Sequence, residues 1–74
     1  MNEHDSVVLV RALPAHGLQA GDVGAIVNVY ADRRAYEVEF VASDGATLAV
    51  VTLEAGDIRP LASREVLHAR PLAV

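Results

Sequence analysis

The amino-acid sequence predicts an all-β fold, a small barrel of five short strands that is closed or nearly closed. A glycine-punctuated loop, residues 17–24, leads directly into a β-branched segment, and glycine permits both a sharp turn and a close approach of two backbones. Apolar and polar residues alternate strictly over Ala35–Val41, as in a strand with one buried face. Turn signals recur about every ten residues, a spacing typical of small all-β domains.

The first half of the chain should form three strands. The first is expected at Val7–Arg11, a β-branched run between polar residues, and the second at Gly24–Tyr30, after a loop that contains Pro14. Asp32–Arg34 turns the chain into the third strand, Ala35–Val41. That strand has a face that should be buried and a face that should meet solvent, namely Tyr36, Val38 and Phe40 against Glu37 and Glu39.

The second half should add two more strands. Asp44-Gly45 is the clearest turn signal, because an Asp-Gly pair supplies the positive φ that a tight hairpin needs. The fourth strand, Thr47–Leu53, is apolar on both faces, so we expect another element to cover it. Glu54–Asp57 suits one 3₁₀ turn, and the fifth strand, Ile58–Arg59, is stopped by the proline that follows.

We divide the chain into a barrel, residues 1–61, and a C-terminal extension, residues 62–74, that is either packed on the barrel or an interface segment. Ser63 could cap a short helix that ends at Pro71. Alternatively, residues 66–74 run extended along the barrel. The extension carries more apolar side chains than a disordered tail needs, namely Val66, Leu67, Leu72 and Val74.

Length and composition point to association with another chain. A domain of 74 residues buries only ~60% of the surface that its unfolded form exposes, so its stability should be marginal. The chain has no cysteine, which excludes disulfides and thiolate metal sites. Contact through an apolar face or a strand edge would add burial, so we expect a homo-oligomer or a complex with a protein partner.

Charge argues against nucleic acid as a partner, and the lack of a long aliphatic run argues against a membrane. Ten acidic and six basic residues give a net charge of −4, whereas affinity for phosphate backbones comes mostly from basic side chains. Val7–Val10, the longest aliphatic run near the N-terminus, is too short for a signal-peptide core or a membrane span. We therefore expect a cytoplasmic protein that binds neither nucleic acid nor membranes.

A set of short segments between Val7 and Leu61 is specific in combination, although each segment is weak alone. The segments are Leu13-Pro14, His16-Gly17-Leu18, Gly21-Asp22-Val23-Gly24, Ala35-Tyr36-Glu37-Val38-Glu39-Phe40, Asp44-Gly45, Thr52-Leu53-Glu54-Ala55 and Arg59-Pro60-Leu61. Together they resemble a family of short bacterial proteins, domain of unknown function 4926. The resemblance implies an SH3-like barrel and no assigned activity. The family usually has glycine in the turn that is Asp32-Arg33-Arg34 here, so the type of this turn should differ.

Residues 21–26 are also similar, more loosely, to the KOW motif of ribosomal and transcription-elongation proteins. Modules of that kind bind RNA or protein, and lysines and arginines usually accompany their motif. The equivalent stretch here contains Asp22 and no basic residue. The similarity in fold is unaffected by this difference, whereas the case for RNA binding is weakened.

No combination of residues indicates catalysis, a cofactor or a metal. The spacing of His4, His16 and His68 matches no known ligand signature. Glu37 and Glu39 have the pattern of an ordinary polar sheet face. The serines lack a nucleophile elbow, and the glycines lack the lysine and the helix of a phosphate-binding loop.

One grouping combines basic and aromatic side chains. Arg33 and Arg34 lie at the tip of a predicted hairpin between Tyr30 and Tyr36, a composition found in binding hot spots and base-stacking sites. The alternative is a solvated turn whose arginines keep the sheet edge from associating. With the extension, this grouping gives the candidate interaction surface: Tyr30, Arg33, Arg34, Val66, Leu67 and Leu72.

We interpret the chain as a non-enzymatic protein-interaction module, an accessory or antitoxin-like partner of another bacterial protein. Two alternatives remain open. One is a KOW-like module that binds nucleic acid. The other is a small subunit that caps an enzyme, as SH3-like domains do in the β subunits of nitrile hydratase.

Overall fold

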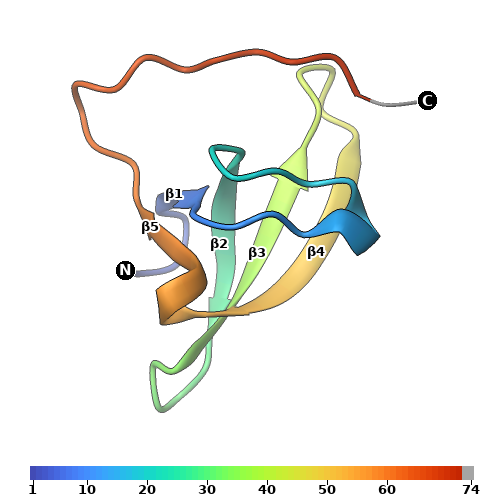
Figure 1. The fold of residues 1–74 in the computed structure, drawn as a ribbon. Helices are drawn as coiled ribbons and strands as arrows, with labels where there is room; N and C mark the ends of the chain where they lie inside the picture. Colours follow the sequence, from blue (N-terminus) through green and yellow to red (C-terminus); the bar gives the residue numbers. More distant parts are fainter. Residues whose placement is uncertain (73–74) are drawn as a thin grey trace.

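The computed structural model describes residues 1–72, which form five strands and two single 3₁₀ turns. The elements are β1 (Ser6–Leu9), η1 (Pro14–His16), β2 (Val23–Val29), β3 (Ala35–Val41), β4 (Thr47–Glu54), η2 (Ala55–Asp57) and β5 (Ile58–Pro60). The strands form one antiparallel sheet in the order β4-β3-β2-β1-β5 (Figure 1). The prediction of a five-stranded all-β fold is confirmed. The sheet is open, with β4 and β5 as its edges, and the likeness to SH3-like barrels stays a prediction.

Strand β3 lies at the centre of the packing. Tyr36, Val38 and Phe40 are buried, as their alternation predicts, and they contact side chains from β1, β2, β4, β5 and the first loop. Glu37 and Glu39 lie on the other face, where both are half-buried and accept hydrogen bonds from neighbouring side chains. Tyr30 Oη donates to Glu37 Oε1 over 2.8 Å, and Thr47 Oγ1 donates to Glu39 Oε2 over 2.7 Å.

Gly24 explains why the glycine-rich segment lies where it does. This residue pairs with Val7 of β1 and passes directly against β3. A Cβ atom at this position would lie 2.7 Å from Val38 Cγ1, and 2.9 Å from both the Glu39 carbonyl oxygen and Phe40 Cε1. Only a residue without a side chain permits this contact between β2 and β3.

The expectation that another element covers β4 holds only at Leu48, which lines a cavity with Leu18 and Leu72, and is wrong for the rest of the strand. Strand β4 is an edge of the sheet, and only one of its faces meets the core, through Ala49, Val51 and Leu53. Val50, on the outer face, is 52% exposed. The apolar outer face of β4 therefore does not indicate a covering layer, because a single small sheet buries only one of its two faces.

The helix considered for the C-terminal extension is also wrong. Residues 61–72 form neither helix nor strand, apart from a turn at Ser63–Arg64. The segment leaves β5 and passes across the molecule toward the β3–β4 hairpin (Figure 1), and its Leu72 lines a pocket with His16 of η1. Val66 is 94% exposed, so a helix here would have no packed apolar face to stabilise it. Val74 lies outside the described residues.

Among residues 1–72, no helix has the length and apolarity that crossing a membrane requires.

Candidate functional site

The structure places the predicted interaction residues at two opposite ends of the molecule. Tyr30, Arg33 and Arg34 lie at the β2–β3 hairpin, and the C-terminal segment crosses the other end of the sheet (Figure 1). These residues therefore do not form one continuous surface.

The hairpin residues are largely engaged within the chain. Arg33 has a φ of 55°, the left-handed conformation that glycine would adopt at this turn, and its guanidinium donates to Asn2 Oδ1 over 3.2 Å. The backbone N–H of Arg34 donates to Asp32 Oδ1 over 3.0 Å, which closes the turn. The Tyr30 hydroxyl is bound to Glu37. Asp32 and the left-handed Arg33 thus form the tight turn between β2 and β3 that a glycine would otherwise permit.

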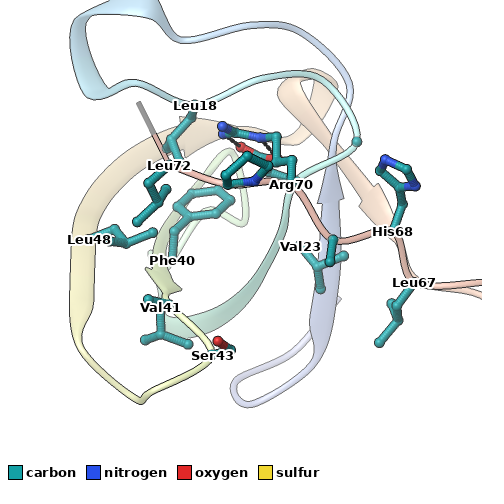
Figure 2. Close-up of a pocket in the computed structure, with 15 residues that line it drawn as sticks. Leu18, Val23, Phe40, Val41, Ser43, Leu48, Leu67, His68, Arg70 and Leu72 are labelled. Atoms are coloured by element: carbon teal, nitrogen blue, oxygen red, sulfur yellow. Dashed lines mark hydrogen bonds and ion pairs between the residues drawn. The ribbon is translucent and has the colours of Figure 1, made fainter. Parts of the chain in front are cut away.

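A cavity of about 560 Å³ lies at the other end, between the sheet and residues 67–72. Its apolar wall comes from three separate parts of the chain: Leu18 in the first loop, Phe40 in β3 and Leu48 in β4. Figure 2 shows Leu72 of the C-terminal segment directed toward this wall, whereas Leu67 lies to one side. The exposed fraction is 45% for Leu72 and 67% for Leu67, so Leu72 is the more covered of the two, although both stay exposed.

Arg70 and Asp22 form the polar side of the same cavity. Arg70 Nε donates to Asp22 Oδ1 over 3.0 Å, and Arg70 Nη2 donates both to Asp22 Oδ2 and, over 3.0 Å, to the Gly17 carbonyl oxygen. The Gln19 backbone N–H also donates to Asp22 Oδ2, over 2.9 Å. The Arg70 hydrogen bonds, aided by that N–H, hold the pKa of Asp22 below its usual value.

A second ion pair holds the C-terminal segment where it leaves the sheet. Arg59 binds both carboxylate oxygens of Glu65, over 2.7 and 2.8 Å. The Ala62 backbone N–H donates to Glu65 Oε1 over 2.7 Å. The Arg59 hydrogen bonds are the main reason that the pKa of Glu65 is lowered to about 2.

Acid should therefore release the C-terminal segment. Because the pKa of Glu65 falls from 4.5 to about 2 on folding, its ion pair stabilises the segment above about pH 4.5 and is lost as the pH falls toward 2. The shift at Asp22 acts in the same direction. In amide ¹H–¹⁵N spectra, the signals of Leu67 and Leu72 should move toward random-coil positions in this range, before those of β3. Release above about pH 5, where both carboxylates are still ionised, would contradict this assignment.

The two edges of the sheet are unequal. Strand β5 has three residues, ends in Pro60 and lies beside the Arg59–Glu65 ion pair, features that obstruct pairing with another strand. Strand β4 has eight residues and contains neither a proline nor a charged residue before Glu54. Within residues 1–72, it pairs with β3 alone. The β4 edge is thus the longer of the two, and it has neither proline nor charge before Glu54.

Ser43 and His68 both line the cavity, and no hydrogen bond joins their side chains among the described residues. Within residues 1–72, no three His, Asp or Glu side chains are grouped in a way that could hold a metal ion.

A family model described as Domain of unknown function (DUF4926) matches residues 3–60. The chain belongs to this family. The DUF4926 match takes in all five strands, Asp22 and the β4 edge. Glu65 and Arg70 lie beyond the matched residues. No curated protein and no solved structure matched the chain significantly.

Sequence reasoning missed Arg70, and it used Asp22 in the family resemblance and in the comparison with the KOW motif without assigning it a partner. The two residues are 48 positions apart, and no local pattern connects them. The sequence did contain one hint of this ion pair. Asp22 is the only acidic residue in the glycine-rich loop, and Arg70 is the only basic residue among the last five residues of the sequence.

Proposed function

We propose that this DUF4926 protein is a non-enzymatic interaction module that binds another protein along the edge of β4. The observation that supports this proposal is the length of the β4 edge strand, which has neither proline nor charge before Glu54. Edge strands in monomeric proteins are usually short, charged or covered, because exposed backbone N–H and C=O groups attract other strands. A partner strand added to β4 would use those groups for affinity.

The outer face of β4 would add specificity. Val50 lies opposite Glu39 of β3, which in turn lies opposite Ala25 of β2. A partner strand beside β4 would place its own side chain next to Val50, and such cross-strand pairs contribute roughly 0.2–1 kcal/mol each. An accessory or antitoxin-like role fits a small domain that is completed by the protein it binds.

Substituting Val50→Lys should abolish partner binding, because a lysine at an exposed edge disfavours strand addition. The matched control is Val10→Lys, since Val10 is 46% exposed and lies outside β4. With each variant immobilised, we expect the wild type and Val10→Lys to retain a protein from the source cells that Val50→Lys loses. If the partner is a second copy, light scattering should show the same difference in molar mass. Identical retention and identical mass for all three proteins would refute the proposal.

We further propose that the chain does not bind nucleic acid. Arg11, Arg59 and Arg70 are paired with carboxylates, which leaves half of the six basic residues for other contacts. Fluorescence anisotropy with labelled single- and double-stranded oligonucleotides should show no binding at physiological salt. Micromolar binding that weakens steeply with salt would favour the KOW-like alternative instead.

A further inference from the structure

We infer that the cavity beside Asp22 is a recognition site for an extended peptide segment in which an arginine precedes an aliphatic residue by two positions. In this structure the chain's own Arg70-Pro71-Leu72 occupies the site as a tethered ligand. The natural occupant is then a segment of a partner protein with the same pattern, which displaces the C-terminal segment. The site contacts β4 only through the side chain of Leu48 and accepts side chains rather than an added strand, so the inference goes beyond the proposed function.

The polar half of the site is specific for arginine. Asp22 accepts from two nitrogens of one guanidinium, and the Gly17 carbonyl oxygen accepts a further hydrogen bond. Lysine could not make this planar, two-pronged contact. Asp22 is oriented by the backbone N–H of Gln19, and the Asp22 backbone N–H donates to the Gln19 carbonyl oxygen over 3.1 Å. This turn belongs to the loop itself, so the carboxylate is in position before any arginine arrives.

The apolar half of the site is specific for an aliphatic side chain and is only partly filled. Leu18 and Phe40 are almost completely buried, and they form with Leu48 the wall that faces Leu72 (Figure 2). Leu72 nevertheless stays 45% exposed, and a cavity of about 560 Å³ remains with the segment in place. A partner that fills this space more completely would gain apolar burial that the tethered segment lacks.

The tether between the two ion pairs holds the segment weakly. After Glu65, the exposed fractions of Val66 and Leu67 are 94% and 67%, so this stretch buries little against the sheet. Docking therefore depends mainly on Arg70 and Leu72. A ligand on a short linker competes at an effective concentration on the order of millimolar, which a free peptide has to overcome. Removing the Arg70 side chain should relieve that competition.

The test uses the full chain and a fluorescein-labelled, C-terminally amidated peptide with the sequence of residues 66–72, Val-Leu-His-Ala-Arg-Pro-Leu. Anisotropy measures its binding to the wild type, to Arg70→Ala and to Arg64→Ala. Arg64 is the matched control, since it lies in the same segment and forms no ion pair with residues 1–72. We expect binding to Arg70→Ala at least tenfold tighter than to the wild type or Arg64→Ala.

Two further arms test the recognition itself. A peptide with glutamine in place of its arginine should lose at least tenfold in affinity for the Arg70→Ala chain. Adding Asp22→Asn to that chain should have the same effect, whereas adding Asp44→Asn should have none, since within residues 1–72 the Asp44 side chain accepts only from the Ala46 N–H in its own turn. The glutamine peptide leaves the protein unchanged, so it stays decisive if the Asp22 variant fails to fold.

Three results would overturn the inference: no binding to Arg70→Ala, equal binding to Arg70→Ala and Arg64→Ala, or equal binding of the two peptides. Combining Val50→Lys with Arg70→Ala should leave peptide binding as it is in Arg70→Ala alone. Failure of the β4 proposal and failure of this inference are therefore distinguishable.

Discussion

Replacing Phe40 by alanine should leave most of the protein unfolded at room temperature. The side chain is 2% exposed and is the largest of the fully buried ones. Truncating a buried phenylalanine costs about 3–5 kcal/mol, because the transfer free energy is lost and a cavity remains. A domain of this size, without disulfides or metal, has a total free energy of unfolding of roughly that magnitude.

Thermal unfolding followed by circular dichroism measures this effect. The matched control is Val41→Ala, one position along β3, where the side chain is 50% exposed. The control should melt close to the wild type, and Phe40→Leu should fall between the two. A Phe40→Ala protein with a near-native melting temperature would mean that the core does not depend on this face of β3.

Replacing Gly24 by alanine should be the second most damaging change, although it adds a single methyl group. The new Cβ would lie 2.9 Å from the Glu39 carbonyl oxygen, and a backbone atom in the middle of a sheet has little freedom to move away. Overpacking of this kind costs about 1–3 kcal/mol. We expect a value toward the upper end, because the methyl group also meets the side chains of Val38 and Phe40.

For a domain of this length, the melting temperature falls by about 4–8 °C for each kcal/mol lost. Gly56→Ala is the matched control, since a Cβ at Gly56 meets nothing within 4 Å and its backbone is not in the left-handed region. That change should be neutral or slightly stabilising, because alanine loses less backbone entropy on folding. Equal melting temperatures for the two variants would show that β2 and β3 can move apart at this point.

Local patterns predicted most of the fold. The alternation from Ala35 to Val41 is a property of consecutive residues, and it identified both the strand and its buried face. The turn signal Asp44-Gly45 is also a property of adjacent residues, and the positive φ that it predicts is found at Gly45, where φ is 89°. The exposure of β4 was not predictable in the same way, because an apolar strand is compatible with one covering layer or two.

The candidate site depended on contacts that sequence patterns do not record. Glu65 binds Arg59, six residues earlier, and Arg70 binds Asp22, 48 residues earlier. The second of these pairs exists only because the fold brings the end of the chain over the first loop. The apolar content of the C-terminal segment indicated that part of it would pack against another surface. It did not show that Leu72 would be more buried than Leu67.

The position of β4 at the edge of the sheet has a consequence for aggregation in the cell. Thr47–Leu53 is a run of seven residues with high β-propensity and without charge, proline or glycine, which is the composition of segments that stack into cross-β fibrils. Most proteins keep such a run inside a sheet, whereas here it forms the outermost strand. If the proposed partner covers β4, chains made in excess of that partner would expose this segment as a site for fibril growth. The proposal therefore implies that the two proteins are produced in matched amounts.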